Sequence, residues 1–575
     1  MATKYAGHVT KRTPKATPQT EPIPSQEDRM VKNSAGGFVY KLDKWSQLNR
    51  FLILGCEGGT YYSSEKKLTK ENAKVIETLI VEDAKRVVDT IVEIVKAGRA
   101  PKMDPALFAL ALVAKTAKKD EERAYANNAV SDVLNIGTHI FDYMNNLREL
   151  GGFGDGTKRS FAKFYNSLSP ERLAFLLAKY QQRNGVSHND VLRLSHIKPC
   201  DEDHEVLYAY ATKKLKPKNL DEKTWTRSFV SCEGKGKEVI TKNIDVVIKD
   251  KYMNILEGME RAKVETTEKG IIKLIEKFNL PQECVPTEFL NKPDVAEALL
   301  QKMPIGATIR ALGKYSAIGL LGPLSSSAKI VQDRILDIDQ LKKGKIHPLQ
   351  VLFALKTYSS GSGFRSDKTW SVNQTIVDCL DDAFYNSFQN VESTGLRYYL
   401  GIDCSGSMGA TINNSNLTVR EAAAAMAMVA AKTEKQHYMA GFISKGGGYM
   451  SRNTGMIDLK ISPKDRLDSA CKKVSRADFG ATDCALPMLD ALEKKMKVDA
   501  FLIITDSETW QGEIHASQAL TQYRKEMGIN SKLIVCGMTS TGFTIGDPED
   551  KNTFNVVGFD TATPNIIAEF AKGNI

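Results

Sequence analysis

The spacing of apolar residues divides the chain into two parts. From about residue 40 to residue 388, apolar positions recur every three or four residues between short breaks, which is typical of amphipathic helices. Several of these segments open on a polar residue followed by proline, a pairing that favours a helix start because the first turn does not use the missing N–H. The pattern predicts helices over residues 69–80, 84–96, 104–117, 121–134 and 171–180.

A repeated stretch indicates how these helices pack. The sequence from Pro105, Pro-Ala-Leu-Phe-Ala-Leu, is echoed from Pro348, Pro-Leu-Gln-Val-Leu-Phe-Ala-Leu. The echo favours stacked antiparallel helix pairs of the HEAT type, although no strict period runs through the sequence. Because one helix pair buries only one face, stacking is expected to produce an extended or closed curved surface, which suits a long partner.

After residues 391–395 the periodicity changes. Short apolar runs predict buried strands over residues 398–403, 438–443, 500–506 and 532–538, and amphipathic segments predict helices over residues 419–432, 463–474, 484–497 and 514–527. This alternation is typical of a doubly wound α/β domain, whose ligand crevice lies at the carboxyl ends of its parallel strands. We therefore expect a helical-repeat domain over residues 34–393 and an α/β domain over 394–575. Residues 1–33, basic and rich in proline, are expected to be a disordered tail.

Oxygen side chains follow two of the predicted strands. Asp403, Ser405 and Ser407 alternate directly after the first, and Asp506 ends another, while Thr482 precedes a predicted helix. Hard cations such as Mg²⁺ take oxygen ligands, so these residues are candidate metal ligands. An isolated Asp-x-Ser-x-Ser is equally compatible with a loop or a helix cap. Read in order, the three loops resemble those of the adhesion site in a von Willebrand factor A domain, and this resemblance favours the metal site.

Composition excludes several classes of protein. An apolar fraction of 42% and a charged fraction of 26% are typical of a folded protein, and we see neither a membrane-length apolar run nor a secretory signal. We therefore expect a cytosolic or nuclear protein. The nine cysteines are scattered without a C-x-x-C pair, so a disulfide framework or structural zinc site is not expected.

The net charge of +10 belongs entirely to the first part. From Leu396 onward there are 20 Lys and Arg and 20 Asp and Glu, which leaves 59 of the 79 basic and 49 of the 69 acidic residues before it. A basic domain joined to a neutral one fits a polyanionic partner for the first. Charge alone fits an ordinary basic surface as well.

The segment from Lys179 to Lys198 is rich in hydrogen-bond donors. Lys179 and Arg183 are four residues apart and would project to the same side of one helix, and Arg193 and His196 would share a face of a second. Such donors suit phosphates and unstacked bases. The alternative from spacing alone is a solvated helix hairpin in which His196 is buried.

Catalytic patterns are missing from the sequence. No segment matches the phosphate-binding pattern G-x-x-x-x-G-K-[ST], and Ser405 stands where a haloacid-dehalogenase-type phosphotransferase needs a second Asp. Two carboxylates, Asp403 and Asp506, are too few for a two-metal nuclease. We therefore expect a binding protein with no catalytic residues, whose metal site is completed by an Asp or Glu from a partner.

Two resemblances sharpen these expectations. The metal-ligand candidates resemble the five positions of a metal-ion-dependent adhesion site in a von Willebrand factor A domain. A basic helical domain before such a domain resembles the family of the Ro 60-kDa autoantigen, the TROVE-domain RNA-binding proteins. The matching runs are Arg50-Phe-Leu, Gly55-x-Glu-Gly-Gly-Thr-Tyr-Tyr, Gln182-Arg-Asn-Gly-x-Ser-His, Leu192-Arg-Leu-Ser-His and Lys532-Leu-Ile-Val-Cys-Gly-Met-Thr-Ser.

The family resemblance implies a function. Its members close the helical repeats into a ring, bind small noncoding Y RNAs on the outer surface, and take single-stranded 3′ ends of misfolded noncoding RNAs, such as defective 5S rRNA precursors, into the ring. By position, Lys179, Arg183 and His196 are expected to contact RNA, with His188 and Arg193 as further candidates. We expect a monomer that takes part in RNA quality control and binds no membrane, with a divalent cation, Mg²⁺, at the adhesion site. The alternative is a protein-adhesion scaffold that acts mainly through that metal site.

Three features depart from the family pattern. Val186 stands where relatives carry Trp, and Ala481 replaces the second glycine of a usual Gly-Gly-Thr. A basic, glycine-containing insert near residues 215–242 lengthens one connection. The insert either adds phosphate affinity or is inert.

Overall fold

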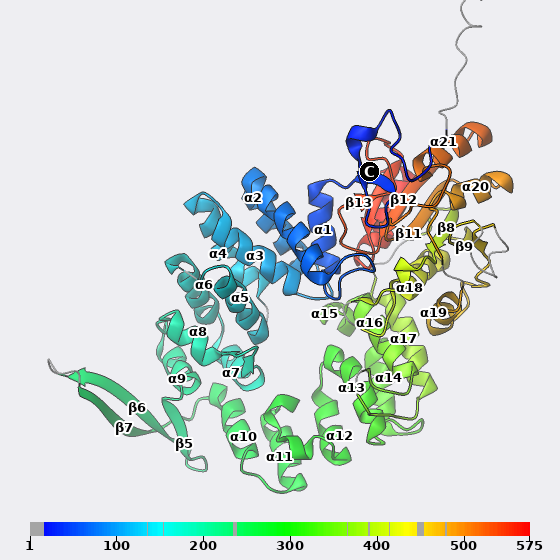
Figure 1. The fold of residues 1–575 in the computed structure, drawn as a ribbon. Helices are drawn as coiled ribbons and strands as arrows, with labels where there is room; N and C mark the ends of the chain where they lie inside the picture. The colour runs from blue at the N-terminus through cyan, green and yellow to red at the C-terminus, as the bar shows by residue number, and fades with distance from the viewer. Residues whose placement is uncertain are drawn as a thin grey trace, which may run out of the picture.

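The computed structural model describes residues 16–134, 136–152, 154–233, 238–364, 366–388, 392–412, 415–445, 454–477 and 480–575. Helices dominate the part of the chain before residue 390. They are α1 (Lys44–Leu54), α2 (Glu65–Lys96), α3 (Asp104–Thr116), α4 (Asp120–Val133), α5 (Gly137–Glu149), α6 (Asp155–Asn166), α7 (Pro170–Lys179), α8 (His188–Leu194), α9 (Glu202–Ala211), α10 (Asn254–Ala262), α11 (Glu268–Phe278), α12 (Pro293–Lys302), α13 (Ile305–Ala317), α14 (Ser326–Leu336), α15 (Ile338–Lys343), α16 (Pro348–Ser359) and α17 (Gln374–Asn386). Figure 1 shows them following one another around an arc, with the α/β domain where the ends of the arc meet.

The predicted helices are present, with one instructive difference. Residues 69–80 and 84–96 belong to a single element, α2, which departs from helical geometry at Asp83 (φ −157°, ψ 86°). The Asp83 carboxylate accepts a hydrogen bond from the Arg86 N–H at 3.0 Å, so it caps the second half as an N-cap residue does. The predicted break is therefore a kink. Ser169 caps α7 in the same way, accepting from Arg172 N–H at 3.2 Å.

The two ends of the helical arc touch one another directly. The turn between α2 and α3 receives a hydrogen bond from Lys345 Nζ to the Lys96 carbonyl, 2.6 Å, and one from Gln350 Nε2 to the Pro101 carbonyl, 3.0 Å. The ring of His347, buried at the start of α16, lies 3.0 Å from the Arg99 carbonyl through Nε2. These contacts join residues almost 250 positions apart and close the arc.

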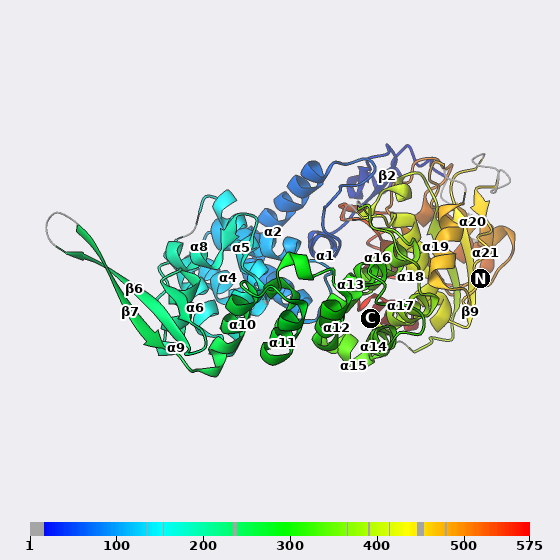
Figure 2. The same ribbon diagram turned by 90° about the horizontal axis from the view of Figure 1, so that it is seen from below.

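The described residues of the helical part include two small sheets. The insert forms three antiparallel strands, β5 (Leu215–Asn219), β6 (Thr224–Glu233) and β7 (Glu238–Val247), in the order β5-β6-β7. A second hairpin is minimal: β3 (Gln182–Arg183) pairs with β4 (Val186–Ser187). Figure 2 shows β6 and β7 projecting away from the helices.

The second part is the predicted α/β domain. Its sheet has the order β10-β9-β8-β11-β12-β14, in which β10 alone is antiparallel. The strands are β8 (Arg397–Asp403), β9 (Gln436–Phe442), β10 (Met456–Ile457), β11 (Ala500–Thr505), β12 (Lys532–Gly537) and β14 (Thr553–Val557), and the helices are α18 (Val419–Thr433), α19 (Leu467–Ser475), α20 (Leu486–Glu493), α21 (Ala516–Met527) and α22 (Thr563–Lys572). The predicted strands and helices of this part are all present, and β10, β14 and α22 are additional.

The described part of the N-terminal segment, from residue 16, packs on the α/β domain. Strands β1 (Met30–Lys32) and β2 (Phe38–Lys41) form a sheet with β13 (Phe543–Thr544). Gln19 is fully buried, and its Nε2 donates to the Asp483 carboxylate at 2.8 Å. The prediction of a disordered tail over residues 1–33 is therefore wrong for residues 16–33, because tertiary contacts hold them, while residues 1–15 lie outside the described part.

Candidate functional site

The two strand-end loops and the Thr482 loop meet at one edge of the central sheet. Because β8 and β11 are adjacent and parallel, Asp403 and Asp506 leave the sheet at the same edge. The Gly406 N–H donates to the Gly480 carbonyl at 2.9 Å, which binds the first loop to the one carrying Thr482. All five predicted metal ligands are buried. Their exposed fractions are 0% for Asp403, 1% for Ser405, 3% for Ser407, 2% for Thr482 and 4% for Asp506.

Hydrogen bonds hold the donors of this cluster in place. Asp403 accepts from the Ser405 N–H at 2.9 Å and from the Thr505 hydroxyl at 2.6 Å. The hydroxyls of Ser405 and Ser407 lie 3.1 Å apart. These contacts fix one carboxylate and two hydroxyls as neighbouring oxygen donors.

The electrostatics of the cluster favour a cation. Burial raises the pKa of Asp506 well above its ordinary value, and the charges of Asp403 and Glu508 raise it further. Burial raises the pKa of Asp403 as well. Glu508 is 1% exposed, and its Oε1 is a buried oxygen with no hydrogen-bond partner among the described residues. Since buried carboxylates are normally paired, this arrangement of oxygens fits a divalent ion.

The loop of residues 55–62, in the helical part, approaches the same cluster. The pKa of Tyr62 is raised to about 12, first by burial and then by the charges of Asp506, Glu508 and Asp403. On another side, the Ala35 N–H donates to Glu508 at 3.0 Å. The site is therefore bordered by the helical part and by the N-terminal segment.

The donor-rich segment adopts a different local structure from the one predicted. Helix α7 ends at Lys179, and Arg183 lies on the β3–β4 hairpin. Asn184 and Gly185, at φ 49° and 75°, form the two-residue turn with positive φ at both positions, which Asn-Gly favours. The prediction that Lys179 and Arg183 share one helix is thus wrong.

Lys179 and Arg183 are both held by neighbouring side chains. Lys179 Nζ lies 5.5 Å from the centroid of the Tyr180 ring. Arg183 is exposed and forms an ion pair with Asp142 of α5, Nε to Oδ2, at 3.2 Å. The Asn184 amide donates to the other oxygen of that carboxylate at 3.0 Å. Asp142 thus fixes the hairpin and leaves Arg183 facing solvent with half of its side chain covered.

His188 is buried, whereas His196 is exposed. His188 is 4% exposed, and its ring lies 2.6 Å from the Tyr165 hydroxyl through Nδ1 and 3.3 Å from the Leu176 carbonyl through Nε2. Burial lowers its pKa to about 4. Both ring nitrogens of His188 are used inside the protein, and its contact with RNA stays a prediction.

Arg193 and His196 remain exposed candidates. Arg193 lies on α8, a helix capped by Ser187, whose side chain accepts from the Asp190 N–H. That helix ends at Leu194, and His196 follows at φ 51°. The predicted shared helix face for Arg193 and His196 is wrong, although both side chains reach solvent.

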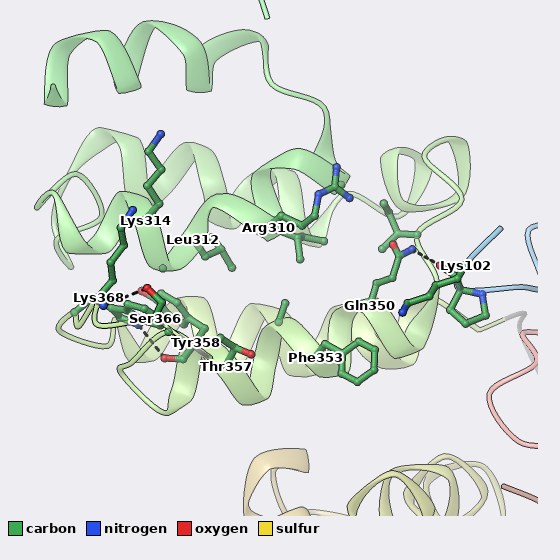
Figure 3. A pocket seen from close by; sticks show the side chains of 18 residues that line it. Lys102, Arg310, Leu312, Lys314, Gln350, Phe353, Thr357, Tyr358, Ser366 and Lys368 are labelled. Carbon is green, nitrogen blue, oxygen red and sulfur yellow. Dashed lines mark hydrogen bonds between the residues drawn. The ribbon is translucent and has the colours of Figure 1, made fainter. Parts of the chain in front are cut away.

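A basic cavity lies between α13 and α16 and was not predicted from the sequence. It has a volume of about 640 Å³ and is lined by four cations, Lys102, Arg310, Lys314 and Lys368, with no carboxylate among the described residues of its wall. Figure 3 shows Lys314 and Lys368 at one end and Lys102 at the other. Lys102 is paired with Glu57, whereas Arg310, Lys314 and Lys368 form no ion pair with any described residue. Burial and then the charge of Lys368 lower the pKa of Lys314, so the cavity favours an anion.

An aromatic side chain completes the cavity wall. Trp370 donates from Nε1 to the Tyr358 carbonyl at 3.0 Å, and its ring stacks on that of Tyr358 with centroids 6.1 Å apart. Trp370 also lies against Gly313 of α13, where an added Cβ would come within 2.7 Å of the indole. Cations beside a fixed aromatic ring are the donor set that nucleotides require. No signal in the sequence pairs Arg310 with Lys368, which are 58 positions apart.

The described part of the chain holds no helix with the length and apolar character needed to cross a membrane. Elsewhere, Cys200, Asp201 and His204 place ligand-type atoms within 4.8 Å of one another. Asp201 caps α9 there and hydrogen-bonds to His204, so helix capping accounts for this group.

Comparisons with known proteins agree on the architecture. Residues 31–362 match the TROVE domain model, and residues 397–571 match the Ro60 vWA domain model. A relative named RNA-binding protein RO60 from Deinococcus radiodurans is 35% identical over 561 residues, covering 97% of this chain and 98% of the relative. Another of that name from Caenorhabditis elegans is 32% identical over 602 residues, covering 96% of this chain and 91% of the relative.

A solved structure gives the same result. The crystal structure of the Deinococcus radiodurans RO (RSR) protein matches with a TM-score of 0.67 at 34% identity, covering 93% of this chain and all of that one. The fold, the order of the two domains and the curated relatives together show that this chain belongs to the Ro60 family of TROVE-domain RNA-binding proteins.

Proposed function

We propose that this protein binds folded noncoding RNAs, among them Y RNAs, and captures the single-stranded 3′ ends of misfolded ones, such as defective 5S rRNA precursors. Its role would be RNA quality control and stabilisation, in the cytoplasm and nucleus. The observation that carries the proposal is the basic cavity, where Arg310, Lys314 and Lys368 have no ion-pair partner among the described residues. The half-buried Lys179 and the exposed Arg183 and Arg193 supply a second basic surface.

The cavity favours a single strand for physical reasons. Each unpaired cation that meets a phosphate releases a counterion, which drives binding without reading sequence. A base freed from its stack gains contact with an aromatic surface such as Trp370, whereas a duplex keeps its bases stacked internally. At about 640 Å³, the cavity has the size of sites that hold small ligands or short segments, and is too small for a duplex.

The test compares two RNA stem-loops that differ only in a single-stranded 3′ tail. Replacing Arg310, Lys314 and Lys368 with alanine should weaken binding of the tailed RNA about tenfold or more at physiological salt and change binding of the blunt RNA little. The matched control replaces three exposed, ion-paired lysines, Lys67, Lys292 and Lys329, which keeps the net charge equal. Equal weakening by both triple variants would show that only total charge matters and would contradict the proposal.

A second candidate function uses the A domain. We propose that Asp403, Ser405, Ser407, Thr482 and Asp506 hold a divalent cation, Mg²⁺ being the expected ion, and that a partner protein completes the shell with an Asp or Glu. When bound, the ion would supply an electrophilic centre that accepts such a carboxylate. The unpaired oxygen of Glu508 favours a cation here and also offers a carboxylate from within the chain.

The test of adhesion is partner capture in Mg²⁺ and in EDTA. A partner held through the ion is released by EDTA and is not captured by Asp403→Ala. If RNA binding is lost equally in EDTA and in the Asp403→Ala variant, the metal has a structural role and adhesion is not its role.

A further inference from the structure

The insert of residues 213–249 forms an arm with a firm base and an exposed outer part. At the base, Trp225 is 1% exposed and meets the Tyr210 ring edge-on, with centroids 6.1 Å apart. Leu215 of β5 is buried beside it, opposite Arg227 in the register. Farther out, Phe229 and Ile244 are 42% and 40% exposed. Figure 2 shows the β6–β7 hairpin extending beyond the helices.

The arm carries half of the net charge of the chain. Residues 213–249 include ten Lys and Arg and five Asp and Glu, an excess of +5 against +10 for the whole chain. Lys218 pairs with Asp245 and Arg227 with Glu205. Lys213, Lys216 and Lys242 form no ion pair with any residue that the structure describes. The positive charge of the arm is therefore largely unneutralised.

On the outer part of the arm, one face combines Lys242 and Arg227 with an aromatic ring. The register places Phe229 opposite Lys242 and Arg227 opposite Ile244, and directly opposed residues of antiparallel strands project to the same face. The Arg227 guanidinium carbon lies 4.9 Å from the Phe229 ring centroid. An exposed ring with cations on either strand suits an unstacked base and its phosphates.

A cleft connects the arm to the donor-rich segment. It has a volume of about 720 Å³. Gln182, Ser187 and Asn189 line it on the side of the β3–β4 hairpin and α8, and Lys213, Lys216 and Pro217 line it on the side of the arm. An RNA strand lying against the polar hairpin side of this cleft therefore faces Lys213 and Lys216 on its other side, and the wall also contains Glu260, which pairs with Lys263.

We infer that the arm is a second RNA-contact element, which holds the backbone of an RNA through Lys213 and Lys216 in the cleft and stacks an unpaired base on Phe229 farther out. The inference rests on the proposed function and adds a surface to it. RNA fits better than an acidic protein because the exposed aromatic ring can stack with the bases of RNA and has no such partner in an acidic peptide. The lysines suit both ligands.

Two double variants separate the parts of the arm. Lys213→Ala with Lys216→Ala removes the cleft cations, and Phe229→Ala with Lys242→Ala removes the outer platform. The matched control, Ser228→Ala with Asn243→Ala, changes an opposed pair on the other face of the same strands. Affinity for a tailed RNA stem-loop is measured by fluorescence anisotropy over a range of salt concentrations, and circular dichroism verifies the fold of each variant.

Both arm variants should bind this RNA about fivefold or more weakly, while the control binds as the unaltered protein. The Lys213→Ala with Lys216→Ala variant removes two phosphate contacts. It should therefore also reduce the slope of log affinity against log salt by about 1.4 to 1.8, a change that a merely structural role would not produce. Unchanged affinity and slope in both arm variants, with weakened binding by Lys179→Ala plus Arg183→Ala, would overturn the arm and leave the proposed function standing. If the triple variant Arg310→Ala, Lys314→Ala and Lys368→Ala also leaves binding unchanged, the proposed function fails too.

A poly-glutamate peptide tests the other occupant. The Phe229→Ala with Lys242→Ala variant should lose RNA affinity to a greater degree than affinity for the peptide, because the peptide has no base to stack on Phe229. Loss of peptide binding with RNA affinity intact would identify an acidic protein surface and overturn the inference.

Discussion

Arg99, in the turn between α2 and α3, forms a bidentate ion pair with Asp560 of the A domain. Its Nε lies 3.0 Å from Oδ1 and its Nη2 2.5 Å from Oδ2 of the carboxylate, and the Asp560 side chain is 3% exposed. The same turn accepts hydrogen bonds from the start of α16. One short turn thus meets both the A domain and the far end of the helical arc.

This ion pair should stabilise the closed arrangement. Asp560→Ala leaves the Arg99 guanidinium in a partly buried place with only the exposed Glu93 as partner, so we expect the free energy of unfolding to fall by about 2 to 4 kcal/mol. Urea unfolding followed by intrinsic fluorescence measures it. The double variant Arg99→Ala with Asp560→Ala should lose less than Asp560→Ala, and an equal or larger loss would contradict a coupled pair.

His188 should make stability depend on pH. Its pKa is lowered from an ordinary 6.5 to about 4 by burial, so between these values the unfolded chain binds a proton that the folded protein does not. The stability contribution is complete above pH 6.5 and is lost as the pH falls toward 4, by up to about 3 kcal/mol. His188→Gln lacks this titration. The deficit of the variant relative to the unaltered protein should therefore shrink between pH 7 and pH 4, and a constant deficit would count against a buried neutral imidazole.

The metal site should reveal itself in thermal unfolding. Without Mg²⁺, Asp506→Asn removes a buried charge that Asp403 and Glu508 repel, so this variant should unfold at the same or a higher temperature in EDTA. Saturating Mg²⁺ should stabilise the unaltered protein, by about 2.7 kcal/mol at a hundred times the Kd, and leave the variant unchanged. An equal Mg²⁺ response in both proteins would place the ion elsewhere.

The proposed role requires no turnover of RNA. Pure protein incubated with a tailed RNA and Mg²⁺ should leave the RNA at full length over hours, as judged by denaturing electrophoresis. Discrete products that disappear with Asp403→Ala would contradict a binding role and revive metal-dependent hydrolysis.

Local sequence signals predicted the features that depend on neighbouring residues, such as strand ends and helix starts. Asp403 and Asp506 each follow a continuous apolar run, so their convergence at one edge follows from two adjacent parallel strands. The helices α3, α4 and α7 start where Asp104, Asp120 and Pro170 stand, close to the predicted bounds.

The errors have two sources: local hairpin signals that the helical spacing obscured, and tertiary contacts that no local signal reveals. Asn184-Gly185 is a hairpin signal and predicts the β3–β4 turn, whereas the four-residue spacing of Lys179 and Arg183 predicts a helix that is not formed. Alternation from Thr224 to Phe229 could have predicted strand β6. No pattern could reveal that Gln19 is buried against Asp483, or that Arg310 and Lys368 line one cavity, because these pairs are set by packing across distant segments.

The most direct test of RNA capture is ultraviolet crosslinking of the protein to the RNAs that copurify with it, followed by RNA sequencing and by mass spectrometry of the crosslinked peptides. The account predicts noncoding RNAs with single-stranded 3′ tails, whose tail nucleotides are joined to peptides containing Trp370 or Phe353 of the basic cavity. No enrichment of such RNAs, or crosslinks confined to surfaces away from both the cavity and residues 179–196, would contradict it.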